Sequence, residues 1–117
     1  PAADADPDDI VRFRAAMDAS SIPFSIMSPV RDGAGAIVDF RWSYVNEANA
    51  ALLGEDRDAL VGARMGERRP GALAVSGLMP LLRRVVERQE RGQTVVDASP
   101  AGIAGWFQVD AAPLGDG

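Results

Sequence analysis

Acid–base chemistry in this sequence would fall to two aspartates and the single tyrosine, Asp39, Asp110 and Tyr44. Burial raises the pKa of an aspartate and lets it act as a general base, while a tyrosine hydroxyl can polarise a carbonyl group. Both aspartates, however, occupy the polar positions of alternating segments. We therefore expect both carboxylates on the exposed face of a sheet, without a second acid or base beside them, and we assign no catalytic residue.

Three neighbouring arginines, Arg64, Arg68 and Arg69, are the candidates for contact with an anion. The guanidinium fork binds carboxylate and phosphate groups well, so an anionic metabolite is a conceivable ligand for this segment. A solvated, arginine-rich loop is the simpler interpretation, because loops are normally exposed and polar.

The composition excludes much other chemistry, because the 117 residues include neither cysteine nor histidine. Haem ligated by histidine, flavin or another chromophore linked through cysteine, and zinc–thiolate sites are therefore ruled out. We expect no metal site. A non-covalent small ligand stays possible, and so does an interior filled by side chains alone.

The net charge is −5, and all 12 basic residues are arginines. This balance argues against nucleic-acid binding, which needs a basic surface. No apolar run approaches the roughly 20 residues of a membrane span, and the N-terminus lacks a basic-then-apolar secretion signal. We expect a cytoplasmic segment without a membrane span.

The elements that would position these side chains begin with a disordered leader at residues 1–7, followed by a single domain at residues 8–117. Asp8 is expected to cap a helix that runs to about Ala19, because its carboxylate can accept a free backbone N–H. The spacing of its apolar residues predicts one stripe, made of Ile10, Phe13 and Met17.

Two alternating segments predict a β-hairpin at residues 21–45. The strands are expected at Ser21–Val30 and Ile37–Val45, with glycines in the turn between them. One face of the second strand is expected to carry Val38, Phe40, Trp42 and Tyr44.

The remaining pattern predicts helices, a loop and a second hairpin. Asn46 and Gly54 suit the start and stop of one helix. The other predicted elements are a short helix at Asp56–Val61, a loop at Ala63–Gly71, an amphipathic helix from Leu78 ending at Gly92, and strands at Thr94–Ala98 and Trp106–Ala112. On the last strand Phe107, Val109 and Ala111 should face one side, opposite Trp106, Gln108 and Asp110.

This order of elements resembles that of a PAS domain, and short motifs support the resemblance. Tyr44-Val45-Asn46-Glu47-Ala48 with Leu52-Leu53-Gly54 is similar to the family's "yvN-x-A … llG" signature, and Asp58-Ala59-Leu60-Val61-Gly62 to its "e-e-l-v-G" segment. Further similar segments are Asp32-Gly33 with Ile37-Val38-Asp39, and Gly105-Trp106-Phe107-Gln108-Val109 with Pro113-Leu114.

The resemblance implies an α+β fold, with a five-stranded antiparallel sheet, helices on one face and an N-terminal amphipathic helix. In the family the fifth strand lies between the first and the fourth, whereas this sequence ends in the turn before it. We therefore expect a C-terminally truncated domain, or a sheet completed by a partner, since unpaired strand edges favour association.

The function that the resemblance implies is a non-catalytic sensory and dimerisation module of a multidomain bacterial signal-transduction protein. A two-component histidine kinase, a cyclic-dinucleotide enzyme or a phosphatase would be the output domain of the same parent chain, and a homodimer is expected. The candidate interface residues are Ile10, Phe13, Met17, Trp42 and Trp106. A ligand between sheet and helices would contact Phe24, Ile26, Leu52, Leu60, Val61, Met65, Leu78, Leu82, Phe107 and Val109.

The alternative function is that of a small cone-shaped α+β isomerase or cyclase. It would use Asp39 or Asp110 as the base and Tyr44 to polarise the substrate carbonyl. The two functions differ in one observable feature, which is whether the two aspartates are buried together in a cleft or exposed on the sheet.

Overall fold

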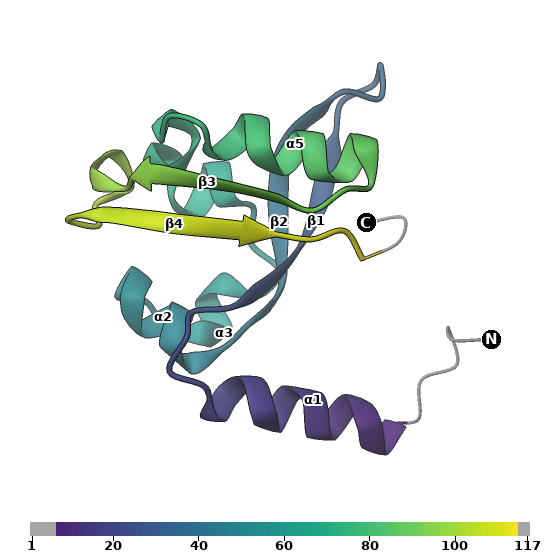
Figure 1. Cartoon of the computed structure of the whole chain (residues 1–117), viewed down its shortest axis with the longest axis vertical. Helices are drawn as coiled ribbons and strands as arrows, with labels where there is room; N and C mark the ends of the chain where they lie inside the picture. The colour runs from purple at the N-terminus through teal and green to yellow at the C-terminus, as the bar shows by residue number, and fades with distance from the viewer. Residues whose placement is uncertain (1–6, 115–117) are drawn as a thin grey trace.

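Two antiparallel β-hairpins, with helices before and between them, make up the fold (Figure 1). The computed structural model describes residues 7–114. Residues 1–6 of the leader predicted at 1–7 lie outside this range, as do residues 115–117 at the end of the predicted final turn, whereas Pro7 begins helix α1. The elements are α1 (Pro7–Ala19), β1 (Ser25–Arg31), β2 (Ile37–Val45), α2 (Glu47–Leu53), α3 (Arg57–Leu60), α4 (Met65–Arg68), η1 (Pro70–Ala74), α5 (Leu78–Arg88), β3 (Gly92–Asp97), η2 (Ser99–Ala101) and β4 (Trp106–Ala111). The predicted α+β class is confirmed.

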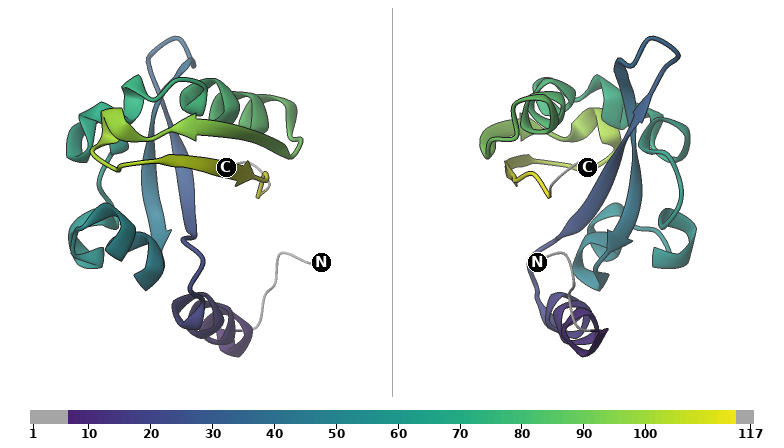
Figure 2. Two further views of the ribbon diagram at one scale, coloured as in Figure 1. Left: turned by 60° about the vertical axis from the view of Figure 1, so that its left-hand side comes forward. Right: turned by 90° about the vertical axis from the view of Figure 1, so that its right-hand side faces the viewer.

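The four strands form two small sheets. β1 pairs with β2 and β3 pairs with β4, and within residues 7–114 no ladder joins the two hairpins. Figures 1 and 2 show that the second hairpin runs across the direction of the first, with α5 along β3. Helix α1 lies at the end of the first hairpin, next to α2 and α3 and away from α5.

Two irregularities in β2 decide which of its side chains reach the interior. Val38 and Ser43 have no partner in the register with β1, so the alternation shifts at each of them. The side chains that enter the core are consequently Ile37, Phe40, Trp42 and Val45. The prediction that Val38 and Tyr44 share a face with Phe40 and Trp42 is therefore wrong.

Tyr44 instead pairs with Ile26 on the opposite face of the first hairpin, where α1 covers both side chains. Trp42 pairs with Met27, the neighbour of Ile26 in β1. Successive side chains of a strand point to opposite faces, so Trp42 and Tyr44 lie on different sides of the sheet.

Local capping signals set the ends of the short helices as predicted. The Asn46 side chain accepts from the Asn49 N–H at the start of α2, and Gly54 ends this helix with a φ of 68°. Asp56 caps α3 in the same way, through the N–H of Asp58. A left-handed φ is accessible to glycine without a steric cost, which explains the residue type at position 54.

Some helix boundaries differ from the prediction. α1 begins at Pro7, so Asp8 lies in its first turn and is not the cap, because proline is well suited to the first helical position. α5 ends at Arg88, where Gln89 takes a left-handed φ of 53°, so the helix stops before Gly92.

The segment predicted as a loop at residues 63–71 contains helix α4 and the start of η1. The cap of α4 comes from a distant residue: the Asp39 carboxylate accepts from the Gly66 N–H at 2.9 and 3.1 Å and from the Phe40 N–H at 2.7 Å. Arg64, the residue that precedes the helix, makes no capping bond itself. A carboxylate from β2 therefore replaces the local signal that the loop prediction lacked.

Candidate functional site

A cleft of about 580 Å³ lies between the first hairpin, α2, α5 and the second hairpin. Its volume falls within the range of small-molecule sites. Most of the predicted pocket residues line it, namely Phe24, Leu52, Met65, Leu78, Leu82, Phe107 and Val109. The face assignment predicted for β4 is confirmed, because the more buried side chains of this strand alternate with exposed ones.

Three predicted pocket residues lie elsewhere. Ile26 faces α1, because its neighbour Met27 takes the position on the cleft side of β1. Leu60 is fully buried in the core with an exposed fraction of 0%, and Val61 is exposed at the surface. Sequence patterning identifies apolar residues but does not distinguish a core position from a cleft position.

Trp42 is the main lining residue that the prediction placed elsewhere. It is only 4% exposed and lines the cleft, so it is not part of an outer dimer interface. The unpaired residue Ser43 shifts the register, so Trp42 and Tyr44 lie on opposite faces of the sheet. No local sequence signal predicts this shift. Other lining residues that the prediction missed are Met27, Phe40, Leu53, Ala72, Val75 and Val86.

The three arginines proposed for anion contact are engaged by acidic side chains. Arg68 and Arg69 both bind Glu55, and Arg64 lies 3.4 Å from Glu67 and 3.8 Å from Asp39. Of the three, Arg69 lines the cleft. An anion that approached these guanidinium groups would compete with carboxylates already in place.

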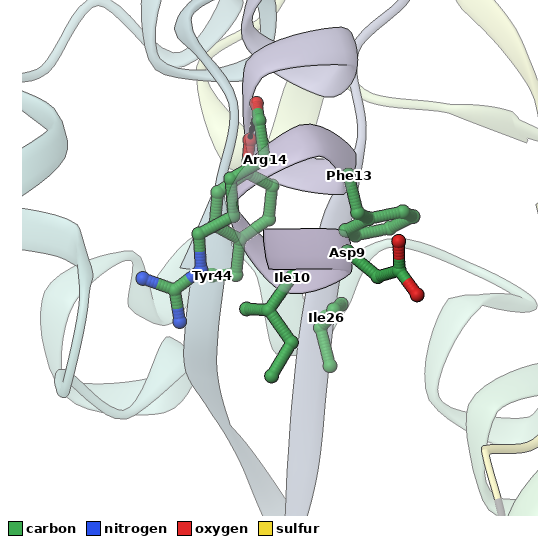
Figure 3. A pocket seen from close by; sticks show the side chains of 6 residues that line it. All are labelled: Asp9, Ile10, Phe13, Arg14, Ile26 and Tyr44. Carbon is green, nitrogen blue, oxygen red and sulfur yellow. Dashed lines mark hydrogen bonds between the residues drawn. The ribbon is translucent and has the colours of Figure 1, made fainter. Parts of the chain in front are cut away.

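A second, smaller cavity of about 350 Å³ lies between α1 and the first hairpin (Figure 3). It is lined by Asp9, Ile10, Phe13, Arg14, Ile26 and Tyr44. The Phe13 and Phe24 rings meet edge to face, with centroids 5.9 Å apart, and Tyr44 lies within 6.5 Å of both. This aromatic cluster attaches α1 to the sheet through apolar contact.

Polar bonds add to this attachment. The Tyr44 hydroxyl donates to Asp18 Oδ1 at 2.8 Å, and the Arg14 carbonyl oxygen lies 3.2 Å from the same hydroxyl. Arg57 of α3 forms an ion pair with Asp18 and lies 3.3 Å from Glu47. Burial, together with the bond to Asp18, raises the pKa of Tyr44, so its hydroxyl remains a donor over a wide pH range.

Tyr44→Phe should lower the free energy of unfolding by about 1 kcal/mol, since the ring contacts remain and the hydroxyl bonds are lost. In the wild type this contribution is complete below pH 10 and disappears as the pH rises through the raised pKa of the folded state. Tyrosine absorbance during an alkaline titration checks the direction, because the chain has one tyrosine and neither lysine nor cysteine. A native midpoint at or below pH 10 would contradict the expectation, and Tyr44→Phe should show no such alkaline loss of stability.

Comparison with protein families gives one match, to the PAS fold, over residues 28–117. The chain belongs to the PAS family. No curated protein matches it. A PAS domain is a sensory signalling module, and such domains commonly dimerise and form parts of multidomain proteins. Helix α1 and the linker that follows it precede the matched residues of this PAS domain.

The acidic residues of this PAS domain do not form a joint acid–base site. Asp39 is buried, contrary to expectation, because segment 62–66 packs along β2 and Gly66 donates to its carboxylate. Asp110 is exposed as expected and accepts from Gln93 at 2.8 Å and Gln108 at 3.2 Å. Within residues 7–114, no hydrogen bond or ion pair joins Asp39, Asp110 and Tyr44, and PAS domains are generally non-catalytic.

Two further findings concern the described part of this PAS domain. No helix in it is long and apolar enough to cross a bilayer. It also contains no group of three or more acidic, histidine or cysteine side chains placed to hold a metal ion.

Proposed function

We propose that this PAS domain is the ligand-sensing and dimerisation module of a multidomain signal-transduction protein, such as a two-component histidine kinase, a cyclic-dinucleotide enzyme or a phosphatase. A small non-covalent ligand would bind in the cleft of about 580 Å³, and α1 would carry the response to the output domain. The observation that supports this proposal is the position of Phe24, which lines the cleft and also contacts Phe13 of α1.

Phe24 offers a direct route from the cleft to α1. Its ring lies edge to face with Phe13, and its backbone N–H donates to Asn46 Oδ1 at 2.9 Å. A ligand that displaces this ring changes the surface on which α1 rests. Such a ligand shifts the population of docked and undocked α1 only by the difference between its affinities for the two states.

The apolar surface of α1 supports dimerisation through this helix. Ile10 and Phe13 are partly exposed, and Val11 is 66% exposed, although the helix also covers the sheet. A cluster of exposed apolar side chains is typical of an interaction surface. Trp106 on β4, 72% exposed, remains the second candidate from the predicted set.

We expect the wild-type domain to be a dimer whose dissociation constant rises at least tenfold in Val11→Glu, because a carboxylate in an apolar interface loses hydration without a partner. Native mass spectrometry over a concentration series measures this constant and also detects any bound ligand by its extra mass. Val38→Glu is the matched control, since Val38 is also exposed but lies in β2, at the first register irregularity. A wild-type monomer, or equal effects of the two variants, would count against dimerisation through α1.

A further inference from the structure

Charged residues in the cleft are few, and one of them lacks a partner. Among the described residues that line the cleft, the ionisable side chains are Arg69, Arg91 and Asp110. The Arg69 guanidinium donates to the carbonyl oxygens of Leu53 at 2.9 Å and Ala101 at 2.6 Å, and it pairs with Glu55 at 3.2 Å. Its charge is compensated within the protein.

Asp110 is also engaged, through both of its carboxylate oxygens. Oδ1 accepts from Gln93 and Oδ2 from Gln108. All three residues belong to the exposed face of the second hairpin, where Gln93 pairs with Asp110 in the register. The Asp110 carboxylate is therefore held by two glutamines on the exposed face of this hairpin, at the rim of the cleft.

Arg91 differs from both, because within residues 7–114 it forms no hydrogen bond or ion pair although it lines the cleft. It lies between α5 and β3, directly before Gly92, which pairs with Ala111. Ala111, Ala112 and Leu114 line the cleft as well, so Arg91 marks the end of the cleft at the open end of the second hairpin. Its side chain is exposed and hydrated there.

We propose that the cleft binds an amphipathic monoanion, with its apolar part against the interior walls and its carboxylate on Arg91. Such a ligand matches the cleft in both respects, because Phe24, Trp42 and Phe107 supply apolar walls while Arg91 supplies an unpaired guanidinium fork. The charged group stays at the hydrated end, so binding does not require a buried charge. This inference rests on the proposed ligand-sensing function and names the class of ligand.

Arg91 is not one of the three arginines that the sequence indicated as anion contacts. Arg64, Arg68 and Arg69 are held by Asp39, Glu55 and Glu67, whereas Arg91 is free to form a bidentate pair.

Three probes with the same eight-carbon tail separate the effect of charge from that of apolar contact: octanoate, 1-octanol and octylammonium. Trp42 lines the cleft and Trp106 is the only other tryptophan, so Trp106→Phe leaves one fluorophore that reports on the site. We expect octanoate to bind about tenfold more tightly than octanol, with octylammonium the weakest of the three.

Arg91→Gln should abolish the preference for octanoate over octanol, and Arg91→Glu should make octylammonium the preferred ligand. Arg88→Gln is the matched control, because Arg88 is an exposed arginine in the last turn of α5 that does not line the cleft. Arg91 is exposed, so its variants should fold, and circular dichroism verifies this.

Two results would overturn the proposal. Equal affinities for the three probes, or a preference that survives in Arg91→Gln, would leave the cleft as a ligand site without a role for Arg91. Absence of any change in Trp42 fluorescence, together with no added probe mass in native mass spectrometry, would exclude binding of this class of ligand. The dimerisation measured with Val11→Glu needs no ligand, so failure of this inference is distinguishable from failure of the proposed function.

Discussion

Asn46→Ala should lower the free energy of unfolding by about 3 kcal/mol, one of the two largest effects expected in this chain. The side chain is fully buried, with an exposed fraction of 0%. Its Oδ1 accepts from the N–H groups of Phe24 and Asn49, and its Nδ2 donates to the carbonyl oxygens of Met17 and Ile22, each at 2.8 Å. Alanine removes the cap of α2, and it also removes the bonds that hold the Phe24 N–H and the Ile22 carbonyl oxygen of the α1–β1 linker.

Urea denaturation of the two proteins measures this loss, and two variants show its origin. Asn49→Ala, three residues further along α2, removes the same amide where no side-chain hydrogen bond is formed, and it should be close to neutral. Asn46→Asp keeps the acceptor that caps α2 and loses the two donors, so it isolates the contribution of the linker. Equal losses in Asn46→Ala and Asn49→Ala would show that the bonds of Asn46 contribute nothing.

Gly71→Ala should also cost about 3 kcal/mol, because there is no space for a methyl group at this position. A Cβ atom on Gly71 would lie 1.9 Å from the carbonyl oxygen of Pro100 and 2.9 Å from its carbonyl carbon. Both atoms belong to the backbone, so η1 and η2 would have to move apart. The expected result is a lower thermal midpoint and a loosened contact between the second hairpin and η1.

Gly33→Ala serves as the control for this substitution. Gly33 lies in the turn of the first hairpin, where an added Cβ atom meets nothing within 4 Å. Its stability should change little, and the difference between the two glycine variants then measures the close approach of Pro100. If both variants had the same midpoint as the wild type, η2 would be free to shift away from η1 without cost.

The elements with local signals could be predicted from the sequence. Asn46 and Gly54 set the two ends of α2 because a cap and a left-handed stop act over a few residues. The apolar spacing of residues 78–86 likewise identified α5 and its contribution to the cleft. The family resemblance, which depends on the order of such elements, was confirmed for the same reason.

The features that could not be predicted depend on residues far apart in the sequence. α4 is capped by Asp39, 27 residues before Gly66, so nothing near residue 65 indicated a helix start. The same bond explains why Asp39 is buried, although its position in an alternating strand favoured exposure. The hydrogen bond between Asp39 and Gly66 therefore determines the burial of Asp39, and the polar–apolar alternation of the strand does not reveal it.

In the candidate site, too, features with a local sequence signal could be predicted and features that depend on distant residues could not. Periodicity predicts that apolar residues such as Phe107 and Leu82 face the interior, and both line the cleft, but it did not separate them from Leu60, which lies in the core. The assignment of anion-binding arginines could not be made in this way, since the carboxylate of Glu55 that engages Arg68 and Arg69 comes from another element. Among the described arginines that line the cleft, Arg69 is engaged and Arg91 is free, and this difference is a property of the folded chain.

The two unpaired residues of β2 also bear on how this domain can vary in length. β2 has 9 residues and β1 has 7, and the difference is taken up by Val38 and Ser43. A deletion at either position would leave each remaining pair intact and each side chain on its present face. A deletion between them, at Phe40 for example, would rotate the flanking residues to the wrong side. Natural length changes in this strand should therefore be confined to these two positions. An engineered variant could be shortened at Val38 or Ser43 with the strand pairing preserved.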